Sequence, residues 1–70
     1  MGLTPKEKAE ELFNKYFIYL RANLLNDEEA IEDAKVCALI AVDEILKVAF
    51  YANDEIFNYY IEVKFEIEKL

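Results

Sequence analysis

Apolar residues recur with a helical period along most of the chain, and three short polar clusters interrupt them. The first cluster places Thr4 and Pro5 before Glu7. Thr4 suits an N-cap, Pro5 suits the first helical position, and Glu7 stands where a capping box needs its acid. The pattern that follows predicts a helix over residues 5–22. At 100° per residue its main apolar face contains Ala9, Leu12, Phe13, Tyr16, Phe17, Tyr19 and Leu20.

The second cluster begins at Asn26 and continues with three acids, Asp27 to Glu29. Asn26 is a favoured N-cap residue, and acids in the first turn interact well with the helix dipole. A helix over residues 27–51 is therefore expected, with small alanines that allow a close approach by a neighbouring helix. Its main face contains Ile31, Ala34, Ala38, Ala41, Val42, Ile45 and Ala49, flanked by Leu39 and Leu46.

The third cluster, Asn53 to Glu55, precedes a segment whose period is ambiguous. Residues 61–68 alternate strictly between apolar and charged, which is typical of a strand. A helical face fits the same segment, and a single strand would have no partner within this chain. We therefore favour a helix over residues 54–69. Its main face contains Ile56, Tyr59, Tyr60, Val63, Ile67 and Leu70.

These segments predict an all-α fold, a single domain over residues 1–70 made of three helices with a long central one. Six further apolar residues lie off the main faces, where three packed helices leave them outside. Exposed apolar patches usually mark interfaces, although single surface hydrophobes are also common. We expect a homo-oligomer: an isologous dimer is the commonest form, and a larger closed ring is the alternative. The candidate interface residues are Ile18, Val36, Ile40, Phe57, Ile61 and Phe65.

Composition supports the need for a partner. The chain has 70 residues, of which 56% are hydrophobic, against about 45–50% in typical domains. A chain this short buries roughly 60% of its unfolded surface, so small domains often need a disulfide, a metal or a partner chain. One cysteine and no histidine argue against the first two. Of the three options, a partner chain supplied by oligomerisation remains.

The net charge of the chain limits the classes of partner that it can bind. Eight basic and fifteen acidic residues give a net charge of −7 and no basic stripe of the kind that binds nucleic acid through phosphates. The same charge argues against docking on anionic membranes. The longest apolar run, residues 36–42, is far shorter than the ~20 residues that span a bilayer. A lone cysteine suits a reducing cytoplasm.

The chain offers little for catalysis. It has no histidine and no serine, the usual members of acid–base and nucleophilic sites. Cys37 lies in the apolar run and is expected to be a small buried hydrophobe. Asp43 and Glu44 are neighbours, hence 100° apart on a helix, and do not converge on one proton. We predict a non-enzymatic protein with no catalytic residue, no cofactor and no metal site.

Five residues are candidates for binding a small anionic ligand of nucleotide type. Lysines at the edge of an apolar face can hold a phosphate, an arginine can add a bidentate contact, and a tyrosine can stack on a base. The simpler alternative is that the lysine stems pack while their ammonium groups reach water, and that the aromatic rings belong to the core. The candidates are Lys35, Lys64, Tyr60, Arg21 and, for a ribose hydroxyl, Asp43.

Three segments resemble a family of short, largely uncharacterised bacteriophage proteins. They are residues 4–12, TPKEKAEEL; residues 34–45, AKVCALIAVDEI; and residues 59–70, YYIEVKFEIEKL. Together they cover most of the chain. This sequence has Tyr59-Tyr60 where the family tends to show Tyr-Trp, and Phe65 where it tends to show a polar residue.

The resemblance implies a phage accessory protein in the cytoplasm of an infected bacterium, and it carries no established activity. Small phage proteins often counter host defence, some as compact oligomers that sequester a nucleotide signal and others by binding a host protein. Our first functional hypothesis is sequestration of a nucleotide-type immune signal at a subunit interface. The alternative is an acidic inhibitor or nucleic-acid mimic that binds a basic host defence protein.

Overall fold

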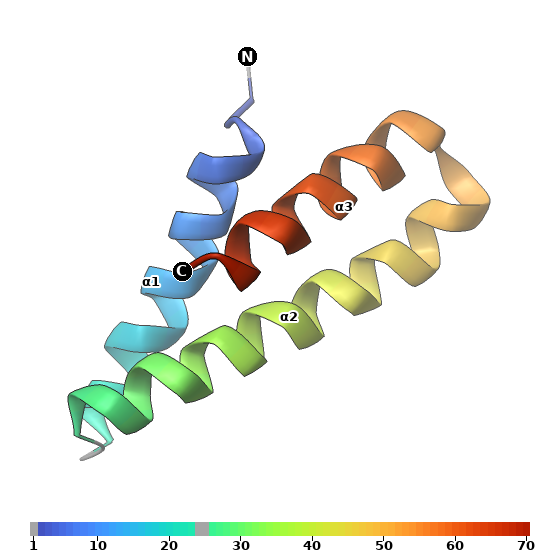
Figure 1. Cartoon of the computed structure of the whole chain (residues 1–70). Coiled ribbons are helices and arrows are strands. Elements are labelled where there is room, and N and C mark those ends of the chain that lie inside the picture. The colour runs from blue at the N-terminus through green and yellow to red at the C-terminus, as the bar shows by residue number, and fades with distance from the viewer. Residues whose placement is uncertain (1, 24–25) are drawn as a thin grey trace.

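Three helices and their caps make up the part of the chain described by the computed structural model, residues 2–23 and 26–70 (Figure 1). They are α1 (Pro5–Ala22), α2 (Asp27–Ala52) and α3 (Asp54–Glu68). The all-α prediction is confirmed, and each predicted boundary agrees to within one residue. The described residues contain no strand, so the strict alternation over residues 61–68 belongs to a helix, and the strand interpretation of that segment is wrong.

Each helix begins at the predicted polar residue. Thr4 and Glu7 form a reciprocal capping box: the Glu7 backbone N–H donates to Thr4 Oγ1 over 3.2 Å, and the Thr4 N–H donates to Glu7 Oε1 over 2.9 Å. Asn26 Oδ1 accepts from the N–H of Glu29 at 2.8 Å. Asn53 ends α2 and begins α3, because its N–H donates to Ala49 O and its side chain accepts from Ile56 N. These bonds satisfy N–H groups that a helix start leaves without partners.

The helices α2 and α3 form an antiparallel hairpin, and α1 packs against both at a large angle (Figure 1). The last turns of α2 and the first turns of α3 extend beyond α1, so that this end of the hairpin is two helices thick. The molecule is elongated, 39 × 22 × 19 Å, with a radius of gyration of 12.6 Å. A well-packed domain of this length has a radius of gyration of roughly 11 Å.

Alanine dominates the core. Ala9 of α1 and Ala38 of α2 are fully buried together with three larger side chains, Val42, Val63 and Ile67. Ala30, Ala34 and Ala49 are buried as well, all on α2. Residues this small let helix backbones approach closely, as the sequence predicted, but they remove little apolar surface from water. The helices are therefore close together around a core of low volume.

Four residues of the predicted main faces are more exposed than expected. Each lies near the end of its helix or just beyond it, where the neighbouring helices diverge. A helical wheel, which places residues at 100° intervals around a single helix, does not take account of that divergence. Tyr19 is the most exposed of them, at 64%, and its placement in the core was wrong. The others are Ile31, Ile56 and Leu70, each between 41% and 47% exposed.

Candidate functional site

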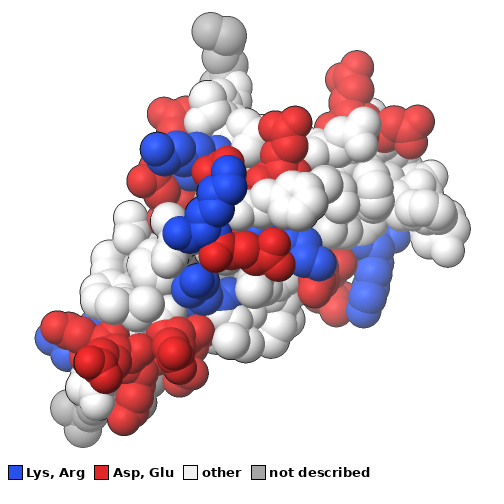
Figure 2. Space-filling view, viewed as in Figure 1, with Lys and Arg blue, Asp and Glu red and all other residues white. Residues whose placement is uncertain are grey.

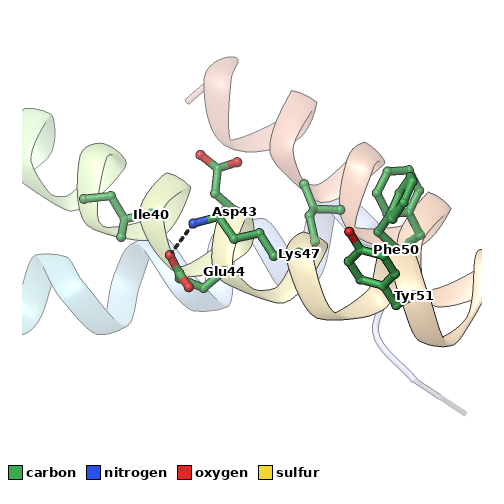
Figure 3. Close-up of a pocket in the computed structure, with 8 residues that line it drawn as sticks. Ile40, Asp43, Glu44, Lys47, Phe50 and Tyr51 are labelled. Carbon is green, nitrogen blue, oxygen red and sulfur yellow. Dashed lines mark hydrogen bonds and ion pairs between the residues drawn. The ribbon is translucent and has the colours of Figure 1, made fainter.

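An open groove on the described surface is formed by the second half of α2 and the start of α3 (Figure 3). Ile40 lies at one end of it and Phe50 and Tyr51 at the other, with Asp43 and Lys47 between them along α2. The complete lining is Ile40, Asp43, Glu44, Leu46, Lys47, Phe50, Tyr51 and Phe57. The groove is open to solvent, so its shape suits a protein surface better than an enclosed small molecule.

Aromatic side chains form the far end of the groove. The ring of Phe50 makes edge-on contacts with two neighbours, Tyr51 at 5.0 Å between centroids and Phe57 at 5.8 Å. Phe50 is still 63% exposed and Tyr51 is 88% exposed. Large aromatic side chains held in fixed geometry yet left in solvent are the usual anchors of protein–protein interfaces.

Charged side chains occupy the middle of the groove. Lys47 Nζ lies 3.1 Å from Glu44 Oε1 one turn away on α2 (Figure 3). Asp43 Oδ1 lies 3.4 Å from Nζ of Lys64, which belongs to α3. The Lys47–Glu44 pair is largely in solvent and the Lys64–Asp43 pair is partly exposed, and pairs in such positions contribute about 0–1 kcal/mol. They are therefore readily rearranged when another surface approaches.

Two predicted ligand-binding lysines already contact acceptors within the chain. Lys64 pairs with Asp43, so the structure brings these two candidates together as an ion pair. Lys35 Nζ lies 3.4 Å from the backbone oxygens of Glu68 and Leu70. A cation suits that position, because the last carbonyls of a helix lack backbone partners and carry the negative end of its dipole. Lys35 thus caps α3 from the side of α2.

The remaining candidates lie farther apart. Arg21 Nε is 2.9 Å from Asp27 Oδ1, across the connection between α1 and α2. Tyr60 is half-buried and makes an edge contact with Tyr59 at 5.1 Å. Sixteen residues of α2 separate Asp27 from Asp43, which is roughly 24 Å at 1.5 Å per residue. The single chain therefore does not gather Arg21 and Lys64 at one pocket.

Four of the six predicted interface residues are exposed by more than half: Ile18, Val36, Ile40 and Phe65. Phe57 and Ile61 were expected on the outside as well, but both are half-buried. The reason is that α3 packs against α1 as well as α2, so a wider arc of it is covered than one contact face would cover. Phe57 keeps a partly open edge in the groove.

Sequence reasoning did not identify five residues of the groove as functional: Glu44, Leu46, Lys47, Phe50 and Tyr51. A signal was present, because Val36, Ile40, Asp43, Lys47 and Phe50 follow one another at spacings of four and three. That spacing places them on one stripe of a helix. Two of its five members are charged, so a pattern of apolar residues alone does not reveal the stripe.

A second, smaller depression surrounds the exposed side chain of Phe65. Three glutamates and a lysine line it with the ring: Glu62, Glu66, Glu68 and Lys69. Lys69 Nζ lies 3.1 Å from Glu66 Oε2. An aromatic side chain 57% exposed within a rim of carboxylates has the form of an apolar anchor with a charged border, a common composition for protein contacts.

Acids gather elsewhere too. Figure 2 shows Asp and Glu side chains concentrated over the first turns of α2, at the lower left, with Lys and Arg mainly across the middle of this face. Residues 26–34 contain five acids and no basic residue. Among the described residues no group of three His, Cys, Asp or Glu is placed to hold a metal ion. Cys37, expected to be buried, is a half-exposed free thiol beside Tyr16 and Tyr19.

The resolved pKa shifts lie around the start of α1. Hydrogen bonds from the Thr4 backbone and hydroxyl lower the pKa of Glu7. A hydrogen bond to Glu11, 2.7 Å away, raises the pKa of Lys8. Burial raises the pKa of Tyr59, whose hydroxyl donates to the carbonyl of Leu3 at 2.7 Å. The Glu7 and Lys8 shifts follow from hydrogen bonds to nearby residues of α1 and its cap, and the Tyr59 shift follows from burial.

Within the described residues, none of the helices combines the length and the apolar character needed to cross a bilayer. Comparison of the chain with protein-family models, with curated proteins and with solved structures gave no match. Two surfaces of the chain therefore bear on its function: an open aromatic groove with paired charges at its centre, and an exposed phenylalanine surrounded by carboxylates.

Proposed function

We propose that this chain is a non-catalytic binding protein that assembles as a homo-oligomer and acts by binding a basic surface of another protein. The observation that carries the proposal is Phe65, a large aromatic side chain exposed in a shallow depression whose rim holds Glu62, Glu66 and Glu68. An aromatic anchor supplies affinity when a partner covers it. Carboxylates around it favour a partner whose surface is rich in lysine and arginine.

The resemblance to phage accessory proteins supplies the setting of this proposal. The chain would act in the cytoplasm of an infected bacterium, with a host defence protein as its partner. A net charge of −7 accelerates encounter with a basic target and repels nucleic acid and other acidic surfaces. In this proposal the chain inhibits its target by occupying a surface that the target needs.

Photo-crosslinking tests the proposal. A photoreactive phenylalanine analogue replaces Phe65 in one variant and the exposed residue Glu10, on α1, in a control variant. Both are irradiated in bacterial cytoplasmic extract. We expect a basic protein to be joined to the Phe65 probe and not to the Glu10 probe. Equal labelling from both positions, or none from Phe65, contradicts the proposal. Crosslinking to a second copy assigns Phe65 to the oligomer interface instead.

Purified partner then provides a quantitative test. Phe65→Ala removes the anchor, Glu62→Lys reverses a charge at its rim, and Glu10→Lys reverses a charge away from it. We expect the first two to raise Kd at least tenfold, about 1.4 kcal/mol, and the third to leave it within twofold. Affinity should fall as salt rises, because the attraction is between exposed charges. A Kd that none of the three changes contradicts this placement.

Sequestration of a nucleotide at a subunit interface is the second candidate. One observation favours it: Tyr60 and Lys64 are four residues apart on α3, and Lys35 binds the end of the same helix. That line of one ring and two cations would form a base and phosphate site once a second subunit closes over it. Thermal shift with cyclic nucleotides and ADP-ribose tests it, since a ligand at a hundredfold excess over Kd stabilises by about 2.7 kcal/mol. No shift with any of these ligands contradicts it.

A further inference from the structure

The stripe of α2 residues that crosses the groove is complementary to the same stripe running in the opposite direction. Ile40, Asp43, Lys47 and Phe50 follow in the order apolar, acid, base, apolar. A copy of α2 running in the opposite direction presents the order apolar, base, acid, apolar. Asp43 then lies opposite Lys47 of the second copy, twice about a two-fold axis, and Ile40 lies opposite Phe50, also twice. Contacts of this isologous kind are those that close a dimer.

We propose that the groove is the site at which a second copy of this chain docks, with the two α2 helices antiparallel and the two-fold axis midway between Asp43 and Lys47. The inference rests on the homo-oligomer of the proposed function and adds its surface, direction and register. Two apolar layers flank two central ion pairs, with the exposed rings of Phe50 and Tyr51 at the outer ends of the contact.

Charge selects the antiparallel direction. In a parallel pair Asp43 faces Asp43 and Lys47 faces Lys47, and like charges at such positions oppose association. The acids of residues 27–33 would also lie side by side in a parallel pair. In the antiparallel pair these two acidic segments lie at opposite ends, roughly 45 Å apart by helix rise. That separation is several times the screening length of about 8 Å at physiological salt.

The exposed surface area of the chain supports docking of a second copy. The chain exposes 5118 Å², whereas a folded monomer of its mass is expected to expose roughly 4,500 Å². The excess of roughly 600 Å² approaches the ~800 Å² that each partner loses in a standard interface. Much of the exposed apolar surface belongs to α2, including Val36, Ile40 and Phe50, which share the stripe. A second copy removes this surface from water.

The existing ion pairs permit the docking. Lys47 now contacts Glu44, and Asp43 contacts Lys64. In the dimer each central lysine gains a second carboxylate and each central aspartate a second cation, so neither loses a partner. These side chains are exposed in the single chain and lie at the centre of the contact in the dimer. Their desolvation opposes docking, and the second opposite charge that each of them gains offsets that cost. Phe57, half-buried beside Phe50, supports the apolar end of the contact from α3.

A pair of charge-reversal variants tests the register. Asp43→Lys places two lysines on the stripe, and Lys47→Asp places two aspartates there. Each variant alone puts like charges opposite each other at both central positions, so its dimer Kd should rise at least tenfold. An equimolar mixture restores both opposite-charge pairs, and we expect a heterodimer of one chain of each kind. Recovery in the mixture also shows that both variants fold.

Matched controls carry the same changes in charge away from the groove. Glu10→Lys and Lys15→Asp alter exposed residues of α1 and should dimerise as the wild type does. Native mass spectrometry separates the two variants by mass. Sedimentation at about 10–100 μM, the concentration range in which a dimer of moderate affinity forms, gives the oligomeric state. The wild type is expected at twice 8.2 kDa.

Three results overturn the proposal. A wild type that stays monomeric over this range removes both the dimer and the oligomer of the proposed function. A dimer that persists in Asp43→Lys and in Lys47→Asp removes the register and leaves an oligomer built on another surface. Variants that dissociate but do not recover in the mixture show that the charges act locally rather than across the two-fold axis. The crosslinking at Phe65 is read separately from all three.

Discussion

Lys64 on α3 and Asp43 on α2 form an ion pair across the hairpin, with Nζ and Oδ1 3.4 Å apart. The sequence proposed both as contacts for an anionic ligand, and in the single chain each neutralises the other. A ligand phosphate at Lys64 must therefore compete with Asp43 for the ammonium group. Their side chains are 37% and 50% exposed, so water already screens the interaction.

We predict that Lys64→Gln lowers the free energy of unfolding by less than about 1 kcal/mol. The loss should shrink further in 1 M salt, because exposed pairs are screened. Urea unfolding followed by circular dichroism measures it, with Lys6→Gln as the control at an exposed lysine of α1. A loss that is larger and independent of salt shows that the stem of Lys64, rather than its charge, packs against the hairpin.

The core makes a sharper prediction at Ile67. This side chain is fully buried with Val42 and Val63, and it is among the few large groups in a cluster that also holds Ala9 and Ala38. Ile67→Ala should lower the free energy of unfolding by about 2–5 kcal/mol, since it removes apolar burial and leaves a cavity. Much of the stability of so small a domain is then lost. Chemical denaturation measures the change.

Ile18→Ala is the matched control for that substitution. The same atoms are removed from α1, but Ile18 is 67% exposed. A substitution at such a surface position changes the free energy of unfolding by no more than about 0.5 kcal/mol. A comparable loss in the two variants means that Ile18 is covered in solution, which points to a subunit contact at that end of α1.

The capping box predicts a dependence on pH. Hydrogen bonds from Thr4 hold the pKa of Glu7 below its ordinary value in the folded chain. The folded state therefore releases this proton more readily than the unfolded state. The stabilisation is present above the ordinary glutamate pKa and is lost as pH falls through the lowered folded pKa. Comparison of wild type with Glu7→Gln isolates it.

That comparison uses thermal unfolding between about pH 3 and pH 6, the range around an ordinary carboxyl pKa. Glutamine keeps an acceptor at the N3 position but carries no charge. The wild type should be the more stable at the upper end, and the two should converge at the lower end, where Glu7 is protonated. A difference that does not vary with pH shows that geometry, not charge, determines the strength of the box.

Tyr59 predicts the opposite pH dependence, a loss of stability at alkaline pH. Its hydroxyl donates to Leu3 O at 2.7 Å, and burial raises its pKa above the ordinary tyrosine value. Stability from this group is present below the ordinary pKa and is lost as pH rises through the raised one. Ultraviolet titration of the five tyrosines should show a late-ionising group that is absent in Tyr59→Phe. Its absence from the wild type would contradict the contact.

Tyr59→Phe should also loosen the turn before α1. The substitution removes the hydrogen bond and leaves the Leu3 carbonyl without this donor, at a cost of about 1 kcal/mol. Hydrogen exchange of the first turn of α1 should be faster, while exchange in the middle of α2 stays unchanged. Tyr16→Phe, at another half-buried tyrosine, controls for the loss of a hydroxyl.

The sequence predicted the helices well because their ends are decided locally. Thr4, Asn26 and Asn53 each bond to a backbone N–H within three residues, so their effect does not depend on the rest of the fold. The exposure of Tyr19 and the half-burial of Phe57 depend instead on where neighbouring helices diverge or overlap. A helical wheel describes one helix and contains no information about that geometry.

The candidate site was harder to predict for the same reason. Lys35 was identified as a cation at the edge of an apolar face, but its contact is the end of α3, more than thirty residues away. The groove on α2 escaped because Asp43 and Lys47 interrupt its apolar stripe. Charged residues on a helix face are ordinarily solvated, so Asp43 and Lys47 gave no reason to single out this stripe.

The alanine core has a consequence for how such a chain changes over generations. Ala9 and Ala38 hold the helices at a spacing that leaves no room for a larger side chain, since added methylenes in a packed core cost about 1–3 kcal/mol. Ala34, buried on the same helix, is subject to the same restriction. Inherited variation is thereby directed to the outer positions, where substitutions leave the backbone unaltered.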